Sequence, residues 1–160
     1  MLDVCTGSGA VALALAHERP DLRITGSDIS AEALALAGEN ARRLGLPVSW
    51  LHADLLDHME MPPAAVLANP PYVPDAEHSG LAPEITRHEP SLALLGGPDG
   101  LDVVRRLIAQ AGAARVPLLA VEVGAGQAAE AIELARAAGF ARVRAERDLA
   151  GIERAVVAEC

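Results

Sequence analysis

Asp3-Val4-Cys5-Thr6-Gly7-Ser8-Gly9-Ala10 takes the chain from a short apolar strand through a glycine-rich turn into a helix. Glycine permits a tight turn, and the free backbone N–H groups and positive dipole end at the start of a helix can approach a ligand closely. The turn also fits the dinucleotide-binding pattern G-x-G-x-x-A from Gly7 to Ala12. By itself it does not choose between cofactors, and glycines that only tighten a turn would look the same. We predict a cofactor loop here.

The pattern of strand followed by helix repeats along the chain, which predicts a parallel sheet covered by helices on both faces. Strands are expected at Leu2 to Val4, Leu22 to Gly26, Val48 to Leu51, Ala65 to Ala68 and Pro117 to Val123. Helical patterns cover Ala10 to Glu18, Ala31 to Leu44, Leu101 to Ala114 and about Gln127 to Ala138. The predicted fold class is therefore α/β, with a doubly wound, Rossmann-like sheet.

The last part of the chain adds two strands of a different kind. Apolar and polar residues alternate from Ala141 to Glu146 and from Arg154 to Ala158, with a short turn between them at Asp148 to Gly151. Such a pair forms an antiparallel hairpin at a sheet edge, so we predict a mostly parallel sheet of seven strands. A chain of 160 residues is the size of one domain, spanning 1–160. The first strand should be central yet starts almost at residue 1, so we also expect that upstream sequence is missing.

The segment from Tyr72 to Gly100 shows no clear periodicity and holds four prolines after Val73. Irregular segments of this length are rarely mere connectors. We interpret the segment as a candidate lid or substrate loop.

Three acidic residues stand where they could bind a cofactor. Asp28 ends the second strand nineteen positions after Gly9, where an acid binds ribose hydroxyls. Asp3 precedes the glycine turn, and a carboxylate there repels a pyrophosphate and attracts an amino group such as that of S-adenosylmethionine. Asp54 follows the third strand and could accept a hydrogen bond from an adenine amine. It could equally be the N-cap of the short segment after it.

Asn69-Pro70-Pro71-Tyr72 follows the fourth strand directly and points to the chemistry. Two prolines remove backbone donors and stiffen the chain, which leaves the Asn69 side-chain oxygen and a backbone carbonyl as convergent acceptors. Such a pair can hold the two hydrogens of an NH2 group. Tyr72 is one of three aromatic residues in the chain, and its ring could lie against a planar acceptor. The alternative is a turn that contains these four residues by chance.

Composition argues against several classes of protein. Hydrophobic residues make up 51% of the chain, but no stretch approaches the roughly 20 apolar residues of a membrane span. The formal net charge of −9 argues against nucleic-acid binding, which relies on cationic residues. Cys5 and Cys160 match no metal-ligand spacing, so we expect two reduced thiols and no metal site. The sequence opens on a strand and not on a basic and apolar leader, so a cytoplasmic protein is expected.

Taken together, the glycine turn, Asp28 and Asn69-Pro70-Pro71-Tyr72 resemble the class I methyltransferases that modify amines attached to planar groups. Further segments resemble the protein glutamine N5-methyltransferases of the HemK/PrmC type, which act on peptide chain release factors. These segments are Glu89-Pro90-Ser91-Leu92-Ala93-Leu94, Gly96-Gly97-Pro98-Asp99-Gly100-Leu101-Asp102, Glu122-Val123-Gly124 with Gln127, and Asp148-Leu149-Ala150-Gly151. The resemblance covers almost the whole chain. It departs from the family in two ways, since the usual amino-terminal helical domain is not present and Cys5 stands where a glycine is common.

The resemblance implies methylation of a glutamine side-chain amide in a protein, a peptide chain release factor, with S-adenosylmethionine as cofactor. The residues implied to bind the cofactor are Asp3, Thr6, Gly7, Gly9, Asp28, Asp54 and Asn69. Asn69, Pro70 and Pro71 would hold the glutamine amide, and Tyr72 would pack near it. One alternative is methylation of an exocyclic amine on a nucleic-acid base, which presents the same NH2 group. A second is a truncated remnant that binds cofactor without turnover.

Overall fold

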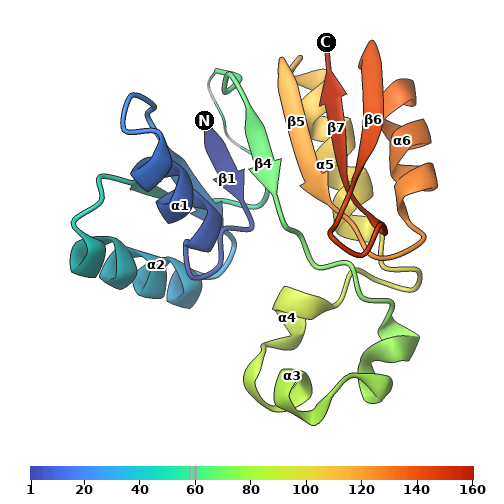
Figure 1. Ribbon diagram of the computed structural model, residues 1–160, viewed down its shortest axis with the longest axis horizontal. Helices are drawn as coiled ribbons and strands as arrows, with labels where there is room; N and C mark the ends of the chain where they lie inside the picture. Colours follow the sequence, from blue (N-terminus) through green and yellow to red (C-terminus); the bar gives the residue numbers. More distant parts are fainter. Residues whose placement is uncertain (58, 60) are drawn as a thin grey trace.

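The apolar runs of the sequence build one seven-stranded sheet in a computed structural model that describes residues 1–57, 59 and 61–160 (Figure 1). The strands are β1 (Leu2–Val4), β2 (Thr25–Asp28), β3 (Ser49–His52), β4 (Val66–Ala68), β5 (Leu118–Glu122), β6 (Arg142–Arg147) and β7 (Glu153–Glu159). Their order across the sheet is β3-β2-β1-β4-β5-β7-β6. The first five strands in this order pair in parallel, and β7 pairs antiparallel with both β5 and β6. The predicted doubly wound sheet with a carboxyl-terminal antiparallel hairpin is confirmed.

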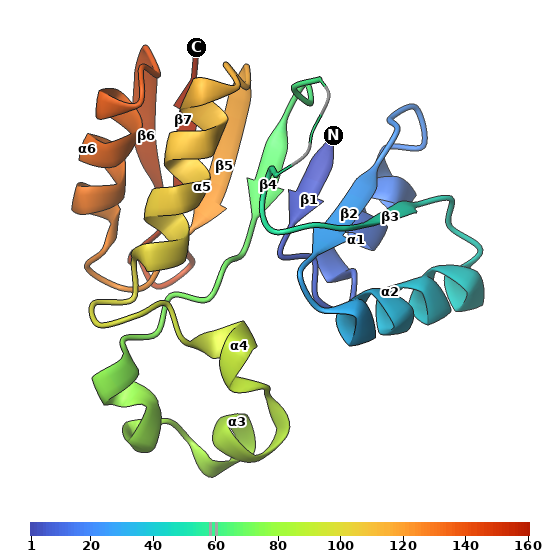
Figure 2. The same ribbon diagram turned by 180° about the vertical axis from the view of Figure 1, so that it is seen from behind.

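Four long helices cover the sheet: α1 (Ala10–Glu18), α2 (Ala31–Leu44), α5 (Asp102–Ala113) and α6 (Ala128–Ala137). The helices α5 and α6 pack against each other on one face, and α1 lies on the other (Figures 1 and 2). Local signals set the ends of α2, because the Ser30 hydroxyl accepts from the Ala33 N–H at its start and Gly45 adopts φ 67° at its end. The predicted bounds of α1 and α2 are those observed.

The main core lies between the central strands and the helices α5 and α6. All three residues of β1 are buried because the strand is paired on both sides, with β2 and with β4. Leu107 and Ile108 of α5 are also fully buried. Each buried side chain of this size contributes about 1.5–3 kcal/mol to folding. The carboxyl ends of the parallel strands are thereby fixed relative to one another.

Two predictions about local structure are wrong. The second strand begins at Thr25 and not at Leu22, because its pairing starts opposite Leu2, the first residue of β1. Leu22 packs instead with the smaller apolar cluster around α1. The segment after Tyr72 is also not irregular. It forms the 3-10 helix η1 (Asp75–Gly80) and the helices α3 (Pro83–His88) and α4 (Ser91–Leu94), all too short to show a clear helical period.

We refer to residues Val73–Leu95 as the lid segment. It leaves and rejoins the rest of the chain through a parallel bridge between Val73 and Leu95. In Figure 1 it lies below the carboxyl ends of β1, β4 and β5. Across the described ranges, no helix has the length and apolar character needed to cross a membrane.

Candidate active site

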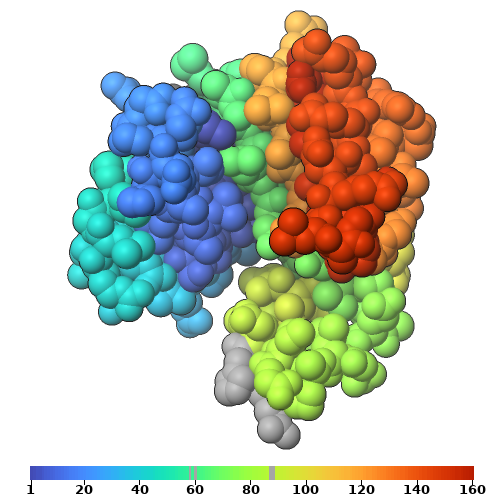
Figure 3. Space-filling model, in the orientation of Figure 1, coloured from blue at the N-terminus to red at the C-terminus, as the bar shows by residue number. Residues whose placement is uncertain are grey.

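A cavity of about 420 Å³ opens at the carboxyl edge of the sheet, between the turn after β1 and the lid segment. Figure 3 shows the molecule hollowed between the blue amino-terminal part and the yellow-green lid. This volume lies within the range of small-molecule sites. Among the residues predicted to bind the cofactor or the acceptor, those that line the cavity are Asp3, Thr6, Gly7, Asp28, Asp54, Asn69 and Pro71. Gly9, Pro70 and Tyr72 are not among the lining residues.

Asp3 is the buried acid beneath the glycine turn. Its Oδ2 accepts a hydrogen bond from the Thr6 hydroxyl at 2.5 Å and from the Ala12 N–H at 3.1 Å. These bonds tie the turn to the start of α1. Burial raises the pKa of Asp3, and the two hydrogen bonds act in the opposite direction.

Asp28 holds the glycine turn from the neighbouring strand. Its Oδ2 accepts from the Gly7 N–H and its Oδ1 from the Ser30 N–H, both at 2.9 Å. Gly7 adopts φ 54°, in the region that favours glycine. A carboxylate offers about four acceptor positions, so Asp28 keeps acceptor capacity toward the cavity that it lines. Gly9 has a packing role, because a Cβ there would lie 2.8 Å from the Trp50 ring.

Cys5 occupies a strained position in the cavity wall. Its φ of 56° lies in the left-handed region, which favours glycine over residues with a side chain. Burial raises the pKa of the Cys5 thiol to about 12, and the nearby carboxylates of Asp28, Asp3 and Asp54 add to the rise. The thiol is therefore neutral at physiological pH and a poor nucleophile.

The turn after β3 is held by helix α5. The Asp54 Oδ2 accepts from the Arg106 guanidinium at 2.7 Å. One helical turn further along, Gln110 accepts from the Leu56 N–H at 3.0 Å and donates to Asp57 Oδ1 at 2.8 Å. Residues 54–57 form a bend and a turn, not the start of a helix. The Asp54 carboxylate is paired with a side chain, so the N-cap alternative for this residue is not found.

Residues Asn69–Tyr72, which we call the acceptor loop after the role predicted for them from the sequence, follow directly after β4. Asn69 is exposed at the cavity, and its side chain makes no hydrogen bond to the described part of the chain. Tyr72 turns toward the end of β5, where its hydroxyl donates to Glu122 Oε1 at 3.1 Å. Burial raises the pKa of the Tyr72 phenol, and the Glu122 carboxylate raises it further.

Sequence reasoning missed several lining residues. Ile29 and Leu55 line the cavity and follow Asp28 and Asp54 directly in the sequence. They could therefore have been predicted from their positions next to the two acids. Val103 and Arg106 of α5 had no such signal, because their approach depends on tertiary structure. The lid segment contributes Glu89, Pro90, Leu92 and Ala93. These four lie in the predicted substrate loop and in a segment that carries the family resemblance, but no role was predicted for any of them. Within residues 1–57, 59 and 61–160, no cluster of three or more His, Cys, Asp or Glu residues could hold a metal ion.

Comparisons with known proteins agree with this geometry. Residues 1–93 match the model of the methyltransferase small domain family. The chain is 45% identical over 163 residues to the release factor glutamine methyltransferase of Gloeobacter violaceus, and 45% identical over 158 residues to that of Deinococcus radiodurans. Each match covers 98% of this chain and 57% or 56% of the relative, so the chain spans a little over half the length of these relatives.

A solved structure shows the same fold at low identity. The magnesium protoporphyrin IX methyltransferase (ChlM) of Synechocystis PCC 6803, with bound SAM, superposes with a TM-score of 0.64 at 16% identity. The match covers 99% of this chain and 68% of that one. The architecture is therefore that of the Rossmann-like class I methyltransferases.

Proposed function

Because the chain belongs to the methyltransferase small domain family, we propose that it transfers a methyl group from S-adenosylmethionine to the side-chain amide nitrogen of a protein glutamine. The acceptor protein in this proposal is a peptide chain release factor, as the names of the relatives indicate. Residues 1–160 then act as the methyltransferase domain. One observation carries the proposal: Asp3 and Asp28 line the same cavity as Asn69, so a cofactor and an NH2 group could meet there.

The residues of the cavity fit S-adenosylmethionine. Asp3 faces the cavity beside the glycine turn, where its carboxylate suits the cofactor amino group. Asp28 keeps acceptor capacity for ribose hydroxyls, and Asp54 for the adenine amine. Ile29 and Leu55 follow these two acids and provide apolar walls for a flat base. The bound cofactor supplies an electrophilic methyl group on a sulfonium.

In this proposal the acceptor loop compensates for the weak nucleophilicity of an amide nitrogen. An amide nitrogen is a weak nucleophile because its lone pair is delocalised into the carbonyl. Asn69 and a neighbouring backbone carbonyl would accept hydrogen bonds from both N–H groups, orient the nitrogen and stabilise the positive charge that develops there. The nitrogen forms a bond to the methyl carbon as the carbon–sulfur bond breaks, and one N–H proton is then lost to water. No general base is required before transfer.

The net charge of the chain and the position of the lid segment at the cavity support a protein as the methyl acceptor. The formal net charge of −9 opposes the approach of a polyanion. The lid segment places Glu89, Pro90 and Leu92 against the cavity, where they could contact a peptide on either side of its glutamine. The free thiols of Cys5 and Cys160 suit the reducing cytoplasm, where translation takes place.

The test is to incubate the chain with methyl-labelled S-adenosylmethionine and a purified bacterial release factor. We expect label in the release factor, and mass spectrometry should place the added methyl on a glutamine side chain. The matched control is the same release factor with that glutamine replaced by alanine, which should take up no label. A nuclease-treated lysate serves as a second acceptor. Absence of protein label, or label that disappears with nuclease, would overturn the proposed acceptor.

A further inference from the structure

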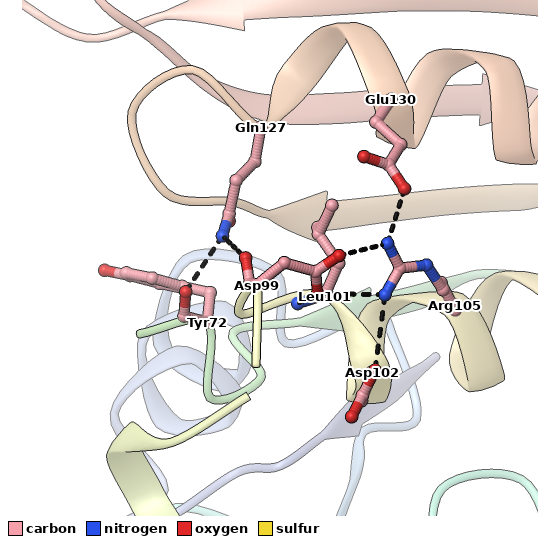
Figure 4. A network of polar contacts seen from close by, with 7 residues as sticks. All are labelled: Tyr72, Asp99, Leu101, Asp102, Arg105, Gln127 and Glu130. Carbon is pink, nitrogen blue, oxygen red and sulfur yellow. Dashed lines mark hydrogen bonds and ion pairs between the residues drawn. The ribbon is translucent and has the colours of Figure 1, made fainter. Parts of the chain in front are cut away.

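Gln127 uses its whole side-chain amide to join three loops at the carboxyl edge of the sheet (Figure 4). Its Oε1 accepts from the Gly124 N–H at 2.7 Å, and its Nε2 donates to the carbonyls of Tyr72 at 3.0 Å and Asp99 at 3.2 Å. One partner is a donor and two are acceptors, so the partners themselves fix the orientation of the amide. The loops after β4, after β5 and before α5 are thus held by one side chain.

Two glycines leave space for this amide. A Cβ at Gly124 would lie 2.8 Å from Gln127 Oε1, and a Cβ at Gly100 would lie 2.6 Å from Gln127 Nε2. The Cβ at Gly100 would also collide with the carbonyl oxygen of Tyr72, and φ at Gly100 is 80°. Both positions therefore require glycine for the close approach of these loops.

The bonds of Gln127 lie at the base of the lid segment. The Val73 N–H donates to the Leu94 carbonyl at 2.9 Å, and the Val73 carbonyl accepts from the Gly96 N–H at 2.9 Å. Gln127 binds the residue just before this base, Tyr72. The two ends of the lid segment therefore lie side by side. Gln127 connects them to the start of helix α6.

Arg105 anchors the turn on the returning side (Figure 4). Its guanidinium donates to both oxygens of Asp99, at 2.9 and 2.5 Å, and to Asp102 at 3.2 Å. It also donates to Glu130 of α6 at 2.5 Å. The Asp99 carbonyl that Gln127 binds therefore belongs to a turn tied to both α5 and α6.

We propose that Gln127 is a positioning residue for methyl transfer, acting through the acceptor loop; this rests on the proposed function. The loop is held at both ends. Ala68, just before it, pairs in the sheet with β1 and β5, and Tyr72, its last residue, is held by Gln127. The two prolines between allow little φ rotation. Fixing Tyr72 thus fixes Asn69, the residue that faces the cavity.

The first test replaces Gln127 with methionine, which has a similar shape and removes all three hydrogen bonds. With the release factor as acceptor, we expect kcat to fall at least about tenfold, because displacing a positioned group is costly to rate. The Kd of S-adenosylhomocysteine, measured by calorimetry, should stay within twofold of wild type, since Gln127 does not line the cavity. Gln127→Glu, which keeps the bond to the Gly124 N–H, serves if the methionine variant does not fold.

The matched control is Ala129→Met, which replaces an exposed residue of helix α6 two positions after Gln127. It should leave both kcat and cofactor affinity as in wild type. An unchanged kcat in the folded Gln127 variant would overturn the proposal. A parallel loss of cofactor affinity would overturn it as well, because the effect would then not pass through the acceptor loop.

A spectroscopic measurement separates this proposal from the proposed function. Tyr72 is the only tyrosine in the chain, so tyrosinate absorbance reports on its phenol alone. Burial raises the pKa of this phenol, and Gln127→Met should lower its titration midpoint as the loop loosens. If wild type methylates no release factor, the proposed function fails and the titration alone decides whether Gln127 holds Tyr72. An unchanged midpoint overturns the proposal in either case.

Discussion

The chain has two glutamines, and each fastens a different loop of the site to the same helical layer. Gln110 of α5 holds the side of the cavity proposed for the cofactor, where it bonds the Leu56 N–H and the Asp57 carboxylate. Gln127, at the start of α6, holds the side proposed for the acceptor, where it bonds one backbone N–H and two backbone carbonyls. Both side chains are half-buried. The same residue type thus serves two halves of one site.

The contacts on the two sides of the cavity differ in the chemical groups that they hold. On the acceptor side all partners of Gln127 are backbone groups in tight turns, so the path of the chain itself is fixed. On the cofactor side two of the contacts are to carboxylates, from Gln110 to Asp57 and from Arg106 to Asp54. Carboxylates can exchange such contacts for water or ligand at little cost when exposed. We infer that the acceptor loop is preorganised and that the turn after β3, at residues 54–57, adapts to its ligand.

The largest effect on activity is expected from Asn69→Ala, which should impair methyl transfer and leave cofactor binding intact. Removing the side-chain acceptor should lower methyl transfer about a hundredfold, as for other preorganised polar groups. Calorimetry should show nearly unchanged affinity for S-adenosylhomocysteine. Asn69→Asp keeps an acceptor oxygen and should retain more activity than alanine. A large loss of cofactor affinity would move Asn69 to the cofactor side and break the comparison.

The next effect is expected from Asp28→Ala on the cofactor side. Loss of a charge-assisted hydrogen bond to ribose should cost on the order of 1.5–3 kcal/mol of cofactor affinity. Asp28 also holds the Gly7 and Ser30 N–H groups, so Asp28→Asn is the control that keeps the shape and one acceptor. Its affinity should lie between those of wild type and alanine. Unchanged affinity in a folded alanine variant would exclude Asp28 from the cofactor site.

Gln110→Met should give the reverse of the pattern expected for Gln127→Met. Loosening the turn after β3 should weaken cofactor binding by about 1 kcal/mol, roughly fivefold in Kd. The kcat at saturating cofactor should stay as in wild type, because the acceptor loop is untouched. Calorimetry and steady-state kinetics on both variants make the measurement. If both variants lose kcat alone, or both lose affinity alone, the division into two halves is wrong.

The parts of the fold that could be predicted are those set by neighbours in sequence. The start of α1 follows from Gly9, and the two ends of α2 follow from Ser30 and Gly45, which are local signals. The start of β2 was misplaced because strand pairing, and not apolar character, sets it. The lid helices were missed because four to six residues cannot show a helical period.

The site shows the same division. The positions of the glycine turn, Asp28 and Asn69 at one cavity could be predicted, because each stands directly at the carboxyl end of a strand. The hydrogen bonds of the two glutamines could not be predicted, since Gln110 and Gln127 lie 54 and 55 positions from residues that they bind. No periodicity or spacing encodes such contacts. Gln127 was noticed only as part of a family resemblance, and its role follows from the packing of three loops.

The smallest effect expected concerns acid stability on the acceptor side. Hydrogen bonds from Arg105 and from the Leu101 N–H lower the pKa of Asp99 to about 2, below the value of about 3.9 for a free side chain. A lowered folded-state pKa contributes stability above the unfolded pKa, and the contribution is lost as pH falls through the folded pKa. Between about pH 4 and pH 2, wild type should therefore lose more stability than Asp99→Asn.

Thermal unfolding across this pH range measures the difference between wild type and Asp99→Asn. The effect should be small, because the Asp99 side chain is 50% exposed to solvent and the Arg105 side chain 33%. The same comparison at 1 M salt is the control, since a Debye length of about 3 Å screens an exposed pair and should shrink the difference. Equal acid dependence of the two proteins at low salt would mean that the Arg105 pair contributes nothing to the turn before α5. The preorganisation of the acceptor side would then rest on Gln127 alone.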